Sequence, residues 1–191
     1  MTSLEWIAAV LGLACVALAV RRSLWTYAFG VASTGLLAVV VFDARLYSQA
    51  LLQLFFVAIN GYGFVTWRRA KVESGTVPVE RMTLREAWLW LAAAVAATLL
   101  AALAMRVSTD AAQPALDAGI AVASVVAQLL MARRKLENWI VWIAVDIASV
   151  PLFLGQGLGI VAALYAVYLA LAIWGLIDWM RAFRRLEPQP A

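Results

Sequence analysis

Long apolar runs separated by short polar stretches dominate the sequence. Seven such runs can be marked, and each approaches the roughly 20 residues that a helix needs to cross a bilayer. This pattern predicts an all-α integral membrane protein with seven transmembrane helices. The predicted spans cover residues 4–20, 24–42, 46–67, 87–105, 115–132, 138–154 and 158–179.

Lysine and arginine residues gather in every second loop. Of the 15 in the chain, all but Arg45 and Arg106 lie in the first, third and fifth loops or after the last span. Because the cytoplasmic loops of membrane proteins are enriched in Lys and Arg, we expect the N-terminus outside and the C-terminus in the cytoplasm. Such an orientation requires an odd number of spans, which agrees with seven.

Composition narrows the classes of function. Hydrophobic residues make up 65% of the 191 residues, too many for a soluble domain of this size to bury, so the main surroundings are expected to be the lipid bilayer. The net charge of +4 comes from short basic clusters between apolar runs, which does not indicate a nucleic-acid partner. With no histidine and a single cysteine, Cys15, the chain lacks a Ser-His-Asp triad and a Cys/His metal cluster. We therefore expect no enzyme, no metal and no cofactor.

The two halves of the sequence align without gaps when Arg21–Arg22 is set on Arg133–Arg134. We call this constant shift the repeat offset. Under it, a shared pattern of aromatic residue, glycine and tryptophan ends the third and seventh spans. Equal spacing of the basic loops gives both halves the same orientation. The sequence thus predicts a single transporter domain with a 3+1+3 parallel repeat, as in SWEET-like transporters. Its parts are repeat 1 at about 4–67, a linker helix at about 87–105 and repeat 2 at about 115–179.

The span 138–154 carries polar and aromatic residues in the middle of an apolar run. On a helix, Asn138, Trp142 and Asp146 fall on one face, with Trp139 beside them. An ionisable side chain at membrane depth normally faces protein or a water-filled cavity, so this face is expected to line a binding site. Three other spans carry similar faces. The predicted site residues are Trp25, Phe29, Gln53, Asn60, Asn138, Trp139, Trp142, Asp146, Tyr165 and Tyr168.

The string E-N-W-x-x-W-x-x-V-D at residues 137–146 is the most specific motif of the chain. A basic pair precedes it, and the span that follows reads L-Y-x-x-Y-L-x-L-A-x-x-G-x-x-x-W. In these motifs, and over nearly its whole length, the chain resembles the PnuC family of bacterial vitamin-precursor transporters. It departs from the family pattern at Val65, Ser149 and Gln156. Ser149 shares the face of Asp146, so that change is expected to enlarge the pocket.

The resemblance implies uptake of nicotinamide riboside across the bacterial inner membrane. It further implies facilitated diffusion, retention of the substrate by intracellular phosphorylation, and a homotrimer. Relatives in the family carry thiamine or riboflavin, so these vitamins stay open as substrates. A proton-coupled carrier is a further alternative, since Asp146 is an acid that a proton can neutralise.

Several of these residues also admit purely structural roles. Asp146 can hold its helix in place through a hydroxyl or amide partner, and Asn138 can cap the helix that it begins. Gln53 and Asn60 can bond between helices without touching a ligand. Trp67 and Trp179 end their spans beside basic residues, a position that favours an aromatic belt at the membrane surface.

Overall fold

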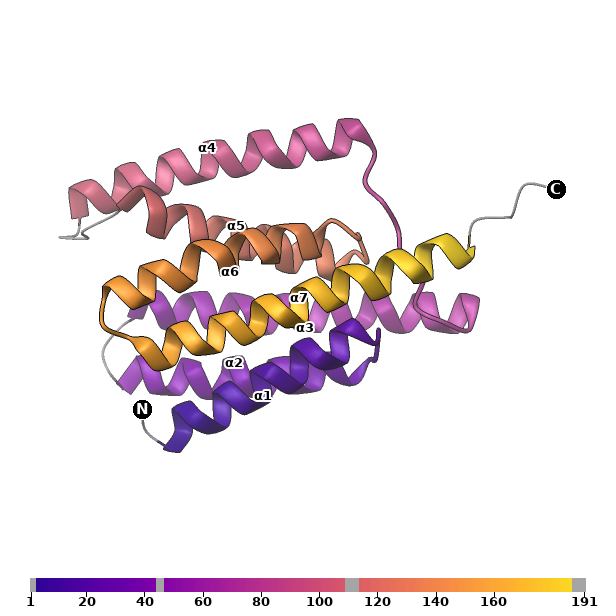
Figure 1. Cartoon of the computed structure of the whole chain (residues 1–191), viewed down its shortest axis with the longest axis horizontal. Coiled ribbons are helices and arrows are strands. Elements are labelled where there is room, and N and C mark those ends of the chain that lie inside the picture. Colours follow the sequence, from indigo (N-terminus) through magenta and orange to yellow (C-terminus); the bar gives the residue numbers. More distant parts are fainter. Residues whose placement is uncertain (1–2, 44–46, 109–113, 187–191) are drawn as a thin grey trace.

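The computed structural model describes residues 3–43, 47–108 and 114–186, and this part of the chain forms seven α-helices (Figure 1). The all-helical prediction is thereby confirmed. The helices are α1 (Ser3–Val20), α2 (Trp25–Asp43), α3 (Tyr47–Ser74), α4 (Leu84–Ser108), α5 (Pro114–Ala132), α6 (Asn138–Gly155) and α7 (Gly159–Leu186). Among the described residues, α1, α4, α5, α6 and α7 are long and apolar enough to cross a membrane, and α2 holds a shorter apolar stretch, Trp25–Val40.

The helix ends follow from local chemistry. α3 and α7 continue beyond their apolar runs, because Arg and Lys favour helices and extend them into the polar surface. α1 and α5 each stop at an arginine in the left-handed region, Arg22 (φ 53°) and Arg134 (φ 60°). In both turns the next amide reaches back five residues, from Ser23 to Leu18 and from Lys135 to Leu130, which is the Schellman arrangement. The same turn thus occurs once in each half, at positions that the repeat offset relates.

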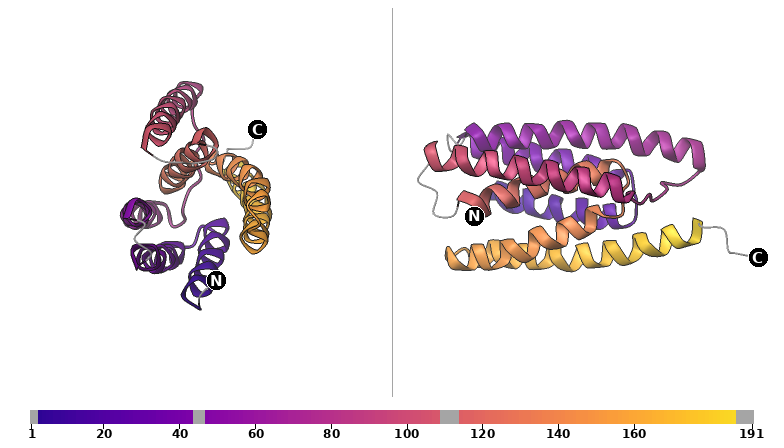
Figure 2. Two further views of the ribbon diagram at one scale, coloured as in Figure 1. Left: turned by 90° about the vertical axis from the view of Figure 1, so that its left-hand side faces the viewer. Right: turned by 90° about the horizontal axis from the view of Figure 1, so that it is seen from above.

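Six helices form a closed ring, and α4 stands outside it. Neighbours around the ring are α1, α2, α3, α5, α6, α7 and again α1, whereas α4 packs only on α5. The end-on view in Figure 2 shows α4 set apart from the other helices beside α5. We call the end of the ring at which α1, α3, α5 and α7 terminate the basic end. An ion pair between Arg22 and Asp178, with 2.8 Å between Nη1 and Oδ2, ties α1 to α7 there.

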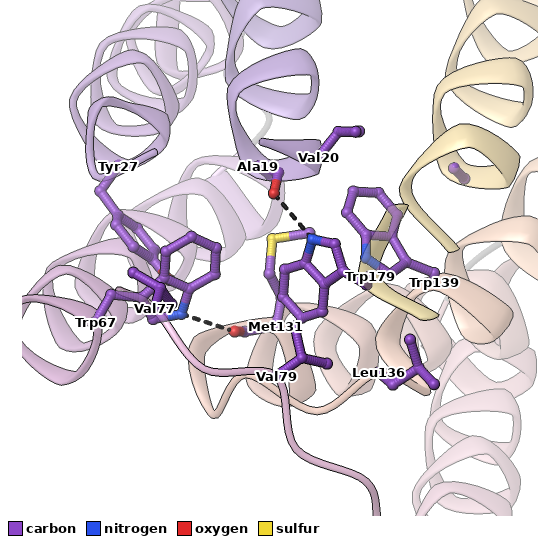
Figure 3. Packing of buried hydrophobic residues seen from close by; sticks show 11 residues of the cluster. Ala19, Val20, Tyr27, Trp67, Val77, Val79, Met131, Leu136, Trp139 and Trp179 are labelled. Carbon is purple, nitrogen blue, oxygen red and sulfur yellow. Dashed lines mark hydrogen bonds between the residues drawn. The ribbon is translucent and has the colours of Figure 1, made fainter. Parts of the chain in front are cut away.

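An aromatic cluster fills the ring at the basic end (Figure 3). The Trp67 indole donates to the Met131 carbonyl oxygen (3.0 Å), and the Trp179 indole donates to the Ala19 carbonyl oxygen (3.2 Å). Both tryptophans are fully buried, with 0% of their surface exposed. The prediction that they belong to an aromatic belt at the membrane surface is therefore wrong. They pack inside the protein because the chain that follows α3 covers them.

That covering segment is the connection between α3 and α4. Val77 and Val79 are buried against the aromatic cluster. Glu80 lies beside the α5–α6 turn: its amide donates to the Arg134 carbonyl (3.0 Å) and its carbonyl accepts from the Leu136 amide (2.8 Å). The Glu80 carboxylate also pairs with Arg134 and Lys135. A stretch whose composition predicts a simple linker is thus a strap across the basic end.

Candidate functional site

A cavity of about 270 Å³ lies inside the ring, next to the aromatic cluster. All six ring helices contribute to its walls, while α4 contributes nothing. The cavity and the cluster share Ala19, Met131, Trp139 and Ala172, so the cluster forms the wall of the cavity toward the basic end. The other lining residues are Gly12, Cys15, Val16, Gly30, Ser33, Thr34, Gln53, Phe56, Asn60, Ser124, Gln128, Trp142, Asp146, Tyr165 and Tyr168.

One side of the cavity, on α3 and α5, carries amides. Gln128 donates from Nε2 to Oδ1 of Asn60 (3.1 Å), and Asn60 donates from Nδ2 to the Phe56 carbonyl (2.9 Å). The Asn60 amide is therefore held in one orientation. A Cβ atom at Gly30 would lie 2.8 Å from Asn60 Oδ1, so the absence of a side chain on α2 makes room for this amide. Gln53 lines the same side, nearer the start of α3.

The opposite side, on α6 and α7, is aromatic and acidic. Tyr165 lies edge-on to Tyr168 and stacks against Phe153, with ring centroids 6.0 and 5.1 Å apart. The indole nitrogens of Trp139 and Trp142 are buried and, within the described part of the chain, have no hydrogen-bond partner. Two free donors thus lie at this wall. Unsatisfied buried donors are uncommon in folded proteins and here point to a partner that the chain itself does not supply.

Asp146 is the acid of this site. It is 3% exposed and lines the cavity, and across residues 3–43, 47–108 and 114–186 it takes part in no hydrogen bond or ion pair. A purely structural carboxylate would be bonded to a neighbouring hydroxyl or amide. Ser149, the nearest hydroxyl on the same helix face, instead donates to the Val145 carbonyl (2.7 Å) and is fully buried away from the cavity.

The structure brings seven of the ten predicted site residues to the cavity wall. They are Gln53, Asn60, Trp139, Trp142, Asp146, Tyr165 and Tyr168. Trp25 is 68% exposed on the outside of the ring, and Phe29 is half-buried away from the cavity. Asn138 is fully buried, but it begins α6 without capping it and donates to the Lys135 carbonyl (2.7 Å). None of these three contributes to the cavity.

The repeat explains the error on α2. Moving back by the repeat offset from Asn138, Trp142 and Asp146 gives Thr26, Gly30 and Thr34. Gly30 and Thr34 do line the cavity, as does Ser33. Trp25 and Phe29 are one residue out of that register, and one residue turns a helical side chain by about 100°.

Sequence reasoning missed the wall that α5 contributes. Gln128 is the only amide in the predicted span 115–132, and an amide at membrane depth is the signal that would have found it. Ser124 lies one turn earlier on the same face. On α1, Gly12, Cys15 and Val16 carry no polar pattern. Only the repeat offset connects them to the site, since it relates them to Ser124, Ala127 and Gln128.

Comparison with known proteins identifies relatives over almost the whole chain. Residues 2–181 match the family described as nicotinamide mononucleotide transporter. The nicotinamide riboside transporter PnuC of Escherichia coli K12 is 30% identical, over 95% of this chain and 87% of the relative. The riboflavin/roseoflavin transporter RibM of Streptomyces davaonensis is 35% identical, over 95% of this chain and 89% of the relative.

A solved structure agrees with these matches. The crystal structure of the vitamin B3 transporter PnuC superimposes with a TM-score of 0.78 at 31% sequence identity, covering 96% of this chain and 83% of the other. The resemblance found in the sequence motifs is thereby confirmed. The family and these relatives are membrane transporters and not enzymes. This chain, with its ring of helices around a polar and aromatic cavity, belongs to the nicotinamide mononucleotide transporter family.

Proposed function

We propose that this protein takes up nicotinamide riboside across the bacterial inner membrane by facilitated diffusion. The observation that carries the proposal is Asp146, a buried carboxylate without a partner among the described residues, beside Trp142 in the cavity. Leaving such a charge unpaired is costly. The nicotinamide ring of the riboside carries a positive charge, which the carboxylate and an indole face can stabilise together; the cation–π part contributes about 1–2 kcal/mol when desolvated.

The opposite wall suits the rest of this substrate. The Asn60–Gln128 pair and Gln53 offer amide donors and acceptors to a carboxamide and to ribose hydroxyls. Binding at such a wall favours ligands that carry hydrogen-bonding groups, because a ligand without them leaves buried amides unpaired. The ten predicted residues reduce, in this proposal, to the seven that line the cavity.

The repeat supplies a mechanism. Two structural pairs support the 3+1+3 parallel arrangement: the Schellman turns at Arg22 and Arg134, and the crossed indole bonds of Trp67 and Trp179. Each Trp bonds to the backbone of the other half, and the repeat offset also relates the partner carbonyls, those of Ala19 and Met131. In this proposal all seven helices span the membrane, and the halves rock about the cavity. The basic end faces the cytoplasm, with the N-terminus outside, and here it is closed.

Trapping and assembly complete the proposal. Passive transport accumulates substrate only if the cell consumes it, so intracellular phosphorylation would retain the riboside. A homotrimer is proposed from the family resemblance. The mass of the detergent-solubilised complex tests the trimer.

Riboflavin is a second candidate substrate. The observation in its favour is identity: the riboflavin/roseoflavin transporter is 35% identical to this chain, and the Escherichia coli nicotinamide riboside transporter 30%. Riboflavin is uncharged and would not need Asp146 ionised. Asp146 also supports the proton-coupled alternative, in which a proton, and not a cationic ligand, neutralises the carboxylate.

Flux into proteoliposomes that contain the purified protein separates these possibilities. Labelled nicotinamide riboside, riboflavin and thiamine are supplied in turn, with and without a pH gradient. The proposal expects nicotinamide riboside to equilibrate at a rate that the gradient leaves unchanged, and expects Asp146→Asn to slow it. If only riboflavin enters the proteoliposomes, riboflavin replaces nicotinamide riboside as the proposed substrate. If the pH gradient drives accumulation, proton coupling replaces facilitated diffusion as the proposed mechanism.

A further inference from the structure

Gly12 on α1 makes room for a side chain from another helix. A Cβ atom at this position would lie 2.5 Å from the hydroxyl oxygen of Tyr168, closer than real Cβ contacts. The next atoms are farther away: Ser33 Oγ at 3.4 Å and Tyr168 Cζ at 3.8 Å. The conflict is therefore confined to one hydroxyl group. Tyr168 reaches from α7 to the neighbouring helix α1, and its hydroxyl occupies the place of a missing α1 side chain.

The positions that the repeat offset relates to this pair carry the reciprocal residues. The offset relates Gly12 to Ser124 and Tyr168 to Phe56, and all four residues line the cavity. In the Gly12–Tyr168 pair the aromatic ring carries a hydroxyl and the facing helix has no side chain. In the Ser124–Phe56 pair the helix has a side chain and the aromatic ring lacks the hydroxyl. Each pair thus holds one extra group, but only the Tyr168 hydroxyl occupies the place of an α1 side chain.

We infer that Gly12 determines the size of ligand that the cavity admits, by allowing the Tyr168 ring to stand back against α1. The inference rests on the proposed function, since it takes the cavity to be the vitamin site. A methyl group at position 12 leaves the Tyr168 hydroxyl no room at α1. The aromatic ring of Tyr168 must then turn toward the cavity, because α1 and α7 pack against each other and leave it no other space. Gly12 is a specificity-determining residue that touches a lining side chain and limits the space beside it.

The substitution Gly12→Ala therefore discriminates between ligands by size. Riboflavin carries three fused rings, whereas nicotinamide riboside carries a single pyridinium ring joined to a ribose, so a narrowed cavity penalises riboflavin more. One methylene in a tight pocket changes discrimination by about 10- to 200-fold. We expect Gly12→Ala to lower riboflavin affinity relative to nicotinamide riboside affinity by at least about tenfold. Adding Tyr168→Phe removes the conflicting hydroxyl and leaves the Cβ next to Cζ at 3.8 Å, so the ratio of the double variant should return to that of Tyr168→Phe alone.

Calorimetric titration of the purified protein with both vitamins measures this ratio for wild type, Gly12→Ala, Tyr168→Phe, the double variant and Gly35→Ala. Gly35 is the matched control, because it also lies in a ring helix and a Cβ there meets nothing within 4 Å. A ratio that changes in Gly12→Ala and, in the double variant, returns to that of Tyr168→Phe alone supports the inference. An unchanged ratio in Gly12→Ala, or a ratio in the double variant that differs from that of Tyr168→Phe alone, overturns it.

A second measurement does not depend on either vitamin. Cys15, the only cysteine of the chain, lines the same cavity. Its labelling by a small maleimide and by a pyrene-bearing maleimide compares two probe sizes. We expect Gly12→Ala to slow the bulky probe about tenfold more than the small one, with recovery in the double variant. If neither vitamin binds wild type, the proposed function fails, and this labelling ratio alone decides the inference: equal slowing of both probes overturns it.

Discussion

The two crossed indole bonds at the basic end give the most specific prediction about transport. Trp67→Phe removes the indole donor that lies 3.0 Å from the Met131 carbonyl oxygen, which then keeps only the Arg134 amide as a donor (2.9 Å). The loss of one such hydrogen bond costs about 0.5–1.5 kcal/mol. If the bond forms only while the basic end is closed, the whole cost falls on the closed state. The population open at that end then rises roughly 2- to 12-fold.

Cys15 reports this opening, since it lines the cavity beside the cluster wall. If the basic end faces the cytoplasm as proposed, a membrane-impermeant maleimide added to inside-out vesicles reaches Cys15 only through that end. We expect Trp67→Phe to accelerate labelling about 2- to 12-fold, and Trp179→Phe to do the same by removing one of the two donors to the Ala19 carbonyl oxygen. Trp88→Phe is the matched control, because Trp88 is 68% exposed on α4. If both indole variants lose thermal stability while labelling keeps its wild-type rate, the bonds hold the fold and do not act as a gate.

Three further predictions concern the site and the strap. Asp146→Asn should weaken nicotinamide riboside binding by about 2 kcal/mol, roughly 30-fold, while leaving riboflavin binding unchanged in calorimetry; equal losses for both vitamins would refute charge pairing. Gln128→Leu should free the Asn60 amide and weaken binding by about 0.5–1.5 kcal/mol, with unaltered affinity counting against the amide wall. Partial burial of Glu80 acts to raise its pKa, but hydrogen bonds and charge from Arg134, and then Lys135, hold that pKa below its usual range. A lowered pKa stabilises the fold above the unfolded value and loses that contribution as pH falls through the folded value, so wild type should lose up to about 1 kcal/mol below roughly pH 4. Thermal melts of Glu80→Gln between pH 7 and pH 3.5 should lack this loss of stability at low pH. The same dependence of stability on pH in both proteins would contradict the pairing of Glu80 with Arg134 and Lys135.

Polar residues in the middle of apolar spans predicted the cavity wall well. Gln53, Asn60 and Asp146 line the cavity, because a polar group at membrane depth normally faces protein or a water-filled cavity. Aromatic residues predicted it less well, since Trp25 and Phe29 do not line the cavity. Lipid is as apolar as a protein core, so Trp25 and Phe29 can face outward without cost, and hydrophobicity does not distinguish the two faces of a span.

The sequence patterns do not indicate that the basic end is closed. Trp67 and Trp179 sit where belt residues sit, and their burial depends on Val77 and Val79 from a segment that its composition marks as a linker. That segment is placed by a long-range pairing of Glu80 with the α5–α6 turn. Pairing of this kind leaves no periodic trace in a single sequence. The repeat offset carried more information than any one motif, since applied strictly it places Gly30 and Thr34 in the wall.

The proposed function requires that the cavity bind nicotinamide riboside through its aromatic and acidic wall. Calorimetric titration of nicotinamide riboside into wild type and Trp142→Ala is the decisive measurement, because the Trp142 indole lines the cavity beside Asp146 and has a free buried donor. We predict one binding site per chain in wild type and an about 5- to 30-fold weaker site in the variant, from lost cation–π contact alone. Equal affinity in both proteins, or no binding to wild type, would contradict the claim.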